Sequence, residues 1–261
     1  MKICVLPLDI VYASPEENIV AVAHALSLVE PDTDVAVLPE LFTTAFVADR
    51  HIASSLAEST DGPTITAVKR WAQFFGFAIA GSYLAKTGEG RCCNRAFFVE
   101  PCGDATYYDK RHLFPLSTED KVYSPGSELP AVVRFRGWDL ALTVCFDLRF
   151  PVWCRNNPAK PYDVMLVPSN WPHSRRHQYH TLLAARAIEN QCYTVGANRI
   201  GTDDYGSYER SDSAIYSNLG EPIQETHRTG YLYAYIDRSH LDRSRERFPF
   251  LSAADRFKIE K

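Results

Sequence analysis

The chain has 261 residues, of which 46% are hydrophobic and 23% charged, a composition typical of a globular protein with a substantial core. A formal net charge of −4 and the lack of a basic block argue against nucleic acid or an anionic membrane as a partner. No apolar run approaches the roughly 20 residues that span a bilayer, and the N-terminal apolar stretch is too short for a signal peptide.

The first half of the chain alternates short apolar strands with helical segments. Ser14 as N-cap, Pro15 at the first helical position and Glu17 near the capping-box position predict that a helix begins here. A second helix is predicted over 63–75. Strands are predicted over 2–8, 35–38, 77–84, 94–100 and 106–110.

The second half resumes this alternation after a loop rich in Ser, Pro and Gly over 117–130. Helical character is found over 178–190. Strands are predicted over 132–135, 140–144, 163–168, 193–198, 213–216 and 231–236. Because no repeat or linker interrupts the pattern, we expect a single α/β domain over 1–261, with an irregular C-terminal tail over 245–261.

The cysteines indicate a compartment. The chain has seven, at positions 4, 92, 93, 102, 145, 154 and 192, an odd number without the spacing of a disulfide framework. This usage favours reduced thiols in the cytoplasm, one of which could be a nucleophile.

Three chemically capable side chains follow predicted strands. Cys145 ends the apolar run 140–144 where a short helix is expected to begin, a position that lowers the pKa of a thiol and exposes its sulfur. The alternative is a buried, inert cysteine. Glu40 and Lys110 also follow strands, and active-site groups gather at strand ends in α/β sheets. Together they offer a nucleophile, a carboxylate base and a cation.

The segments around these residues resemble a known family. VLPELF (37–42), YDKRHLF (108–114) and TVCFDLRFP (143–151) are similar, in order and spacing, to the three catalytic motifs of the carbon–nitrogen hydrolase, or nitrilase, superfamily. The resemblance covers essentially the whole chain. Its other segments, NWP (170–172), ARAIENQ (185–191) and RERFPFLSAADRF (245–257), look most like bacterial ω-amidases, which remove ammonia from the distal amide of 2-oxoglutaramate.

The resemblance implies an α-β-β-α sandwich, usually dimerised, and an amidase that works through a thioester without metal or cofactor. It assigns Glu40 as general base, Lys110 as oxyanion stabiliser and Cys145 as nucleophile. Glu119 falls where the family often carries a second glutamate that supports the lysine. Phe146, where relatives commonly have tyrosine, would contribute its backbone N–H to the oxyanion hole.

A short ω-amide with a free carboxylate needs a cation at the far end of its pocket. Arg149, Arg175 and Arg176 are the candidates, since a guanidinium fork suits a carboxylate, although Arg149 could equally form a structural ion pair. Trp171 could be an apolar wall or a packing aromatic, and Asp147 reads as a helix cap. Amidases acting on deaminated glutathione or carbamoyl compounds share the triad and remain alternatives.

Other chemistries are open at this point. His173, His177 and His180 would share one face of a helix and could bind zinc. His112 could serve a Cys–His hydrolase, although we expect it to brace the lysine loop instead. A nitrilase-like fold that acts only as an interaction module is a further alternative.

Overall fold

The protein is described by a computed structural model over residues 1–157, 160–255 and 257–259. Its larger sheet has seven strands, in which β1, β2 and β3 are parallel and the remaining neighbours antiparallel. In spatial order the strands are β13 (Glu225–Thr226), β14 (Leu232–Tyr235), β1 (Lys2–Val5), β2 (Val35–Val37), β3 (Ala78–Lys86), β4 (Cys92–Val99) and β5 (Ala105–Asp109).

The second sheet has five strands, and its central three, β7, β8 and β9, are parallel. In spatial order the strands are β12 (Ala214–Tyr216), β9 (Tyr193–Asn198), β8 (Val164–Ser169), β7 (Trp138–Leu142) and β6 (Val132–Phe135). A separate antiparallel hairpin is formed by β10 (Gly201–Asp203) and β11 (Gly206–Tyr208).

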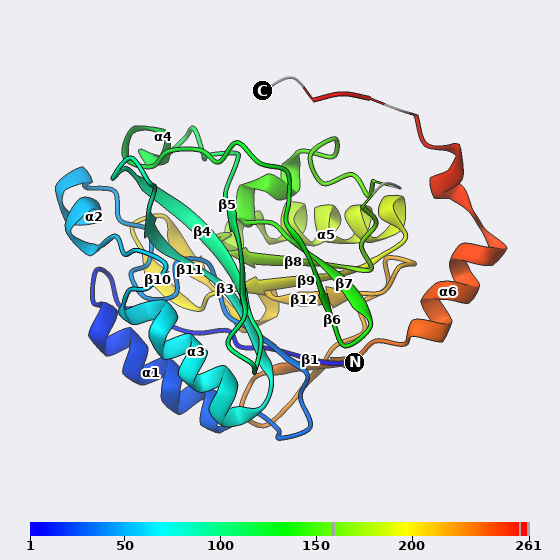
Figure 1. The fold of residues 1–261 in the computed structure, drawn as a ribbon, viewed down its shortest axis with the longest axis horizontal. Coiled ribbons are helices and arrows are strands. Elements are labelled where there is room, and N and C mark those ends of the chain that lie inside the picture. Colours follow the sequence, from blue (N-terminus) through cyan, green and yellow to red (C-terminus); the bar gives the residue numbers. More distant parts are fainter. Residues whose placement is uncertain (158–159, 256, 260–261) are drawn as a thin grey trace.

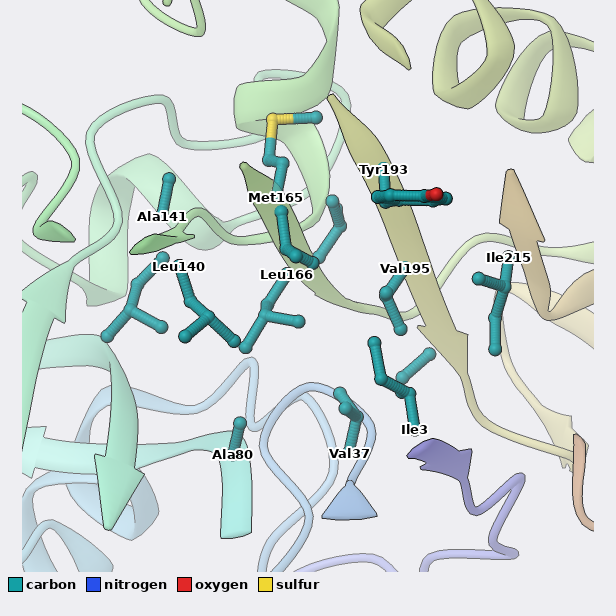
Figure 2. Packing of buried hydrophobic residues seen from close by; sticks show 14 of the residues in the cluster. Ile3, Val37, Ala80, Leu140, Ala141, Met165, Leu166, Tyr193, Val195 and Ile215 are labelled. Atoms are coloured by element: carbon teal, nitrogen blue, oxygen red, sulfur yellow. The ribbon is translucent and has the colours of Figure 1, made fainter. Parts of the chain in front are cut away.

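Helices cover the outer faces of both sheets. α1 (Pro15–Ser27) and α3 (Pro63–Phe75) share a hydrophobic cluster with the larger sheet, and α5 (Arg176–Asn190) packs against the smaller one (Figure 1). The inner faces of the sheets meet in the main core, which draws residues from both (Figure 2). The labelled side chains of Ile3, Val37 and Ala80 there oppose those of Leu140 and Leu166. This is the α-β-β-α sandwich that the family resemblance implies, and it confirms the predicted α/β class.

The core explains why the central strands read as continuous apolar runs. Strands that are covered on both faces bury every side chain, so their sequences do not alternate with polar residues. All three residues of β2 and all six of β8 are buried. These strands were correctly predicted because a strand that is covered on both faces has an uninterrupted apolar sequence.

Three helices escape the sequence prediction, namely α2 (Arg50–Leu56), α4 (Glu119–Val122) and α6 (Arg238–Arg247). α6 also corrects the predicted tail, whose first residues, 245–247, are helical. Its sequence buries only Leu241, so it has no apolar stripe to reveal it. Ion pairs from Arg238 and Arg245 to Asp163, at 2.6 and 2.7 Å, hold the helix to the body instead.

Short 3₁₀ helices complete the described structure. They are η1 (Cys145–Arg149), η2 (His173–Arg175), η3 (Arg210–Asp212) and η4 (Phe250–Ala253). Ser14 is the N-cap residue of α1 as predicted, but its hydroxyl donates to Glu17 (3.3 Å) rather than capping a backbone N–H. Within the described residues, no helix is both long and apolar enough to cross a membrane.

Candidate active site

Strand direction brings the predicted catalytic residues to one end of the sandwich. Glu40 follows β2, and Lys110 follows β5, which runs in the same direction because two antiparallel pairings separate it from β3. In the other sheet Cys145 and Asn170 follow the parallel strands β7 and β8. The carboxyl ends of strands from both sheets therefore supply the site.

Lys110 lies buried between two carboxylates. Its Nζ donates to Glu40 Oε1 at 2.9 Å and to Glu119 Oε1 at 2.7 Å, and all three residues are at most 3% exposed. Burial alone would lower the pKa of Lys110, but the carboxylates of Glu119 and Glu40 raise it well above its usual value. The lysine is therefore a fixed cation, and two of the three N–H groups of its ammonium are used by these carboxylates.

Glu40 is oriented by a residue that the sequence analysis did not single out. Asn94 on β4 donates its Nδ2 to Glu40 Oε1 at 2.7 Å, the oxygen that also accepts from Lys110. Oε2 takes neither bond and is available to the Cys145 thiol, which also interacts with the Glu40 carboxylate. A buried asparagine within an apolar strand is the only signal in the sequence that could have indicated it.

The loop that carries Glu119 is held against the lysine strand. Glu119 Oε2 accepts from the Phe114 N–H at 2.6 Å, and burial raises the pKa of Glu119 although Lys110 opposes that rise. Gly126 closes the loop by donating its N–H to the Lys110 carbonyl at 2.8 Å. A Cβ at Gly126 would lie 2.1 Å from the Asp109 carbonyl oxygen, so this close approach requires glycine.

Cys145 has a strained backbone at the turn from β7 into η1. Its φ of 45° lies in the left-handed region, which non-glycine residues adopt at a cost of about 1–3 kcal/mol. The thiol lines the cavity although the residue is only 8% exposed. The following N–H, that of Phe146, is in the first turn of η1, where backbone N–H groups have no intrahelical partner.

The expectation of an exposed thiol with a lowered pKa is wrong. Burial raises the pKa of Cys145 well above its usual value, and the Glu40 carboxylate adds to the rise. Lys110 and the Asn170 backbone N–H oppose it only in part. The 3₁₀ helix has only five residues, so its dipole is small beside these effects. The resting thiol is therefore neutral and needs a base.

Asp147 and His112 connect the segment around Cys145 to the segment around Lys110. The fully buried Asp147 carboxylate accepts from the Val144 N–H at 3.2 Å, which confirms its predicted role as a cap. It also accepts from the Tyr108 hydroxyl at 2.8 Å and contacts His112 Nδ1 at 2.8 Å. His112 is thus bound to Asp147 and does not line the cavity, an arrangement that disfavours a Cys–His pair.

The cavity in front of the thiol has a volume of about 70 Å³. Its walls combine aromatic and charged residues, and the aromatic ones include the predicted Phe146 and Trp171. Residues that the sequence analysis missed are Phe46, Phe114, Ser117, Asn170, Pro172, Asp203, Tyr205 and Tyr208. Phe114, Asn170 and Pro172 lie in segments that carry the family resemblance but were not assigned to the site. Asp203, Tyr205 and Tyr208 lie on the β10–β11 hairpin, far in sequence from the three motifs, and nothing in their local pattern marks them.

The three candidate arginines separate into two groups. Arg149 and Arg175 line the cavity, with Arg149 4.8 Å from the Trp171 ring centroid and Arg175 4.9 Å from that of Phe114. No described residue forms an ion pair with either. Arg176 lies outside the cavity, because its Nε donates to the Ser211 carbonyl at 3.0 Å near Asp212, so the prediction that it contacts substrate is not supported.

The predicted histidine face does not form. His173 is in η2 and its Nδ1 contacts Asp212 at 2.8 Å, whereas His180 is in α5 with its Nδ1 2.8 Å from the Tyr216 hydroxyl. Over the part of the chain that the structure describes, no three His, Cys, Asp or Glu residues are grouped to hold a metal ion.

The family model for carbon-nitrogen hydrolases matches residues 3–246 of this chain. The chain belongs to the carbon–nitrogen hydrolase family. Its members are hydrolases that act on carbon–nitrogen bonds, and the four-layer sandwich is the fold of the solved nitrilase-superfamily structures that it matches.

Individual relatives extend the match over nearly the full length. The omega-amidase YafV of Yersinia enterocolitica is 38% identical over 260 residues, 98% of each chain. The 2-oxoglutaramate amidase of Bacillus subtilis is 30% identical, covering 94% of this chain and 93% of its own. The crystal structure of XC1258 from Xanthomonas campestris, a CN-hydrolase superfamily protein, superposes with a TM-score of 0.91 at 34% identity and covers 100% of this chain and 99% of its own.

The buried thiol predicts a spectroscopic result. Because its pKa is raised, Cys145 stays protonated at neutral and mildly alkaline pH, so the wild-type spectrum minus that of Cys145→Ala should show no thiolate absorbance there. In Glu40→Gln the thiolate should appear at lower pH than in wild type, because a carboxylate that disfavours it is gone. A thiolate band at neutral pH in the wild-type difference spectrum would contradict this electrostatic description.

Proposed function

We propose that this carbon–nitrogen hydrolase is an ω-amidase that hydrolyses the distal amide of short ω-amido 2-oxo acids, with 2-oxoglutaramate as the preferred substrate. The observation that carries the proposal is a thiol, a base and a buried lysine at one end of a small cavity that also holds two arginines without ion-pair partners among the described residues. The names of the relatives from Yersinia enterocolitica and Bacillus subtilis point to the same chemistry.

The first half of the reaction forms a thioester. Glu40 removes the proton from the neutral Cys145 thiol as the sulfur attacks the amide carbon. The negative charge on the carbonyl oxygen is stabilised by the Lys110 ammonium and the Phe146 N–H. The carbon–nitrogen bond then breaks, and Glu40 returns its proton to the nitrogen, which leaves as ammonia.

The second half uses the same carboxylate for water. Glu40 takes a proton from a water molecule that attacks the thioester carbon, and Lys110 again stabilises the oxyanion. When the carbon–sulfur bond breaks, the sulfur regains a proton from Glu40 and the dicarboxylate leaves. Glu119 and Asn94 act as positioning residues, since each bonds to Lys110 or Glu40.

Arg149 is the group that we assign to the substrate carboxylate. It follows Cys145 by four residues in η1, lines the same cavity and stacks on Trp171, which restricts its guanidinium to one region. The negative charge of Asp203, also in the cavity wall, is offset by Arg199 (3.2 Å) and the Tyr208 hydroxyl (3.0 Å). A substrate carboxylate beside Arg149 and Arg175 therefore meets two guanidinium groups that pair with no described carboxylate.

Ammonia release should separate this function from its alternatives. The screen compares 2-oxoglutaramate with glutamine, asparagine, deaminated glutathione, carbamoyl compounds and simple nitriles. Wild type should favour 2-oxoglutaramate, and Cys145→Ala should lose turnover because no nucleophile remains. Cys102→Ala, which changes an exposed cysteine, should retain it. A preference for a neutral amide or a nitrile would remove the ω-amidase assignment, and activity in Cys145→Ala would remove the mechanism.

Replacing Arg149 should raise the KM for a charged substrate selectively. A hydrogen bond to a charged group is worth about 1.5–3 kcal/mol, so Arg149→Leu should raise the KM for 2-oxoglutaramate about 10–150-fold. Turnover of an uncharged amide of similar length should change far less. Arg176→Leu is the matched control, because that arginine lies outside the cavity. If Arg175→Leu, and not Arg149→Leu, produces the selective loss, the assignment of Arg149 is wrong.

We also propose that the enzyme is a homodimer in the cytoplasm. α6 and η4 stand out from the body of the sandwich (Figure 1), and the chain there exposes Phe248 (41%) and Phe250 (65%). Gln191, at the end of α5, donates to the Phe248 carbonyl at 2.8 Å, so Phe248 lies next to the end of this helix. The same end of α5 exposes Ile188, which adds to the exposed apolar surface. A second copy would cover these apolar side chains.

The cytoplasmic location is supported by the cysteines. All seven are unpaired, as is typical of proteins in a reducing compartment.

Sedimentation velocity tests the dimer. Wild type should sediment at twice the mass of one chain, and Phe250→Ser should shift the equilibrium towards the monomer because it removes apolar surface from the contact. Phe74→Ser, which changes an 81% exposed phenylalanine on α3 at the other side of the sandwich, should leave the dimer intact. A wild-type monomer, or equal effects of the two substitutions, would refute this interface.

A further inference from the structure

Phe46 is a firmly held part of the cavity wall on the side of Glu40. It is in the loop that follows Glu40 and packs edge to face on Tyr123, with ring centroids 5.7 Å apart. Tyr123 follows α4, the helix that carries Glu119, and its hydroxyl bonds to the N–H and the carbonyl of Val47, both at 3.2 Å. The Phe46 ring therefore stands beside the part of the cavity that holds the two carboxylates.

Tyr205 reaches the same place from the β10–β11 hairpin. The Asp203 carboxylate accepts from the Tyr205 N–H at 2.8 Å and from the Tyr208 hydroxyl at 3.0 Å. It also accepts from Arg199 at 3.2 Å, an arginine that is only 2% exposed and donates to the Ile10 carbonyl at 3.0 Å. The hairpin is thereby tied to the buried body of the protein, and this fixes the place of its tip.

The two rings meet at the edge of the cavity. The ring centroids of Phe46 and Tyr205 are 5.5 Å apart with an angle of 71° between the planes, and both residues line the cavity. Tyr205 is also 42% exposed, so the contact lies where the cavity meets solvent. Since both rings are held by their own segments, the contact closes this side of the cavity.

The two ends of the substrate lie in different parts of the cavity. The inference rests on the proposed function, in which Arg149 binds the substrate carboxylate and Glu40 returns its proton to the amide nitrogen. Arg149 is in η1 and stacks on Trp171, so the carboxylate end lies beside η1. The nitrogen has to lie beside Glu40 to receive its proton. A group attached to that nitrogen would therefore extend towards Phe46 and the ring that it contacts.

We propose that the contact between Phe46 and Tyr205 makes the enzyme specific for unsubstituted amides, with Tyr205 as the specificity-determining residue. Ammonia needs no room beyond the amide nitrogen itself, whereas an alkyl or peptide group on that nitrogen runs into the two rings. A clash with a competing substrate is a common source of specificity. The enzyme therefore releases ammonia and rejects amides of larger amines, even when the acyl half is the same.

The test compares Tyr205→Ala with wild type on 2-oxoglutaramate and its N-butyl derivative, which share the acyl group and the carboxylate. Release of 2-oxoglutarate is measured, because it is the product common to both. In wild type the kcat/KM for the N-butyl amide should be about 10–100-fold below that for 2-oxoglutaramate, as expected for an overpacked contact. Tyr205→Ala should raise the kcat/KM for the N-butyl amide about 10-fold, because the clash is relieved.

Tyr205→Phe is the matched control, because it keeps the ring on Phe46 and removes only the hydroxyl. It should keep the wild-type ratio of the two kcat/KM values. Phe46→Leu, which removes the other ring of the pair, should shift that ratio in the same direction as Tyr205→Ala. Equal hydrolysis of the two amides by wild type, or no gain on the N-butyl amide in either ring-removing variant, would overturn the proposal. Failure of wild type to hydrolyse 2-oxoglutaramate would instead overturn the proposed function, so the two failures are distinguishable.

Discussion

The ion cluster of Lys110 with Glu40 and Glu119 is the constraint on which the site depends. Removing one partner from a buried ion pair costs about 3–5 kcal/mol, because a charge then stays buried without compensation. All three side chains are at most 3% exposed, so each has to be in place for the other two to remain ionised or hydrogen-bonded. The end of β2, the end of β5 and the loop closed by Gly126 are thereby fixed relative to one another.

The nucleophile comes from the other sheet, so packing between the sheets sets the distance from thiol to base. β7 delivers Cys145 to the same end of the sandwich as Glu40, and the interdigitated core of the two inner faces holds both strands (Figure 2). The arrangement favours a neutral thiol in the free enzyme. A buried neutral thiol is protected from solution chemistry, and it becomes nucleophilic only when the nearby carboxylate accepts its proton.

The groups that we propose for substrate recognition follow β7 and the neighbouring strand β8. β8 ends at Ser169, after which Asn170 approaches the thiol through its backbone N–H and Trp171 forms the wall that positions Arg149. Cys145 and Arg149 both lie in η1 after β7, and Trp171 follows the adjacent parallel strand β8. In the proposed function, the distance between the scissile amide and the substrate carboxylate is therefore set by η1 and by the wall that Trp171 forms beside it.

The sequence by itself determined the α/β class and the buried strands, because continuous apolar runs mark doubly covered strands, and it placed Glu40, Lys110 and Cys145 at the ends of three predicted strands. The sandwich and the place of Glu119 were implied only by the family resemblance. It could not reveal α6, whose hold on the body is two ion pairs to Asp163 rather than an apolar stripe. Only the tertiary structure decided the pKa of the thiol, since burial and the Glu40 charge outweigh a short helix. It also decided which arginines reach the cavity and that Phe46 contacts Tyr205 there, because both depend on side chains that meet only after the two sheets have packed.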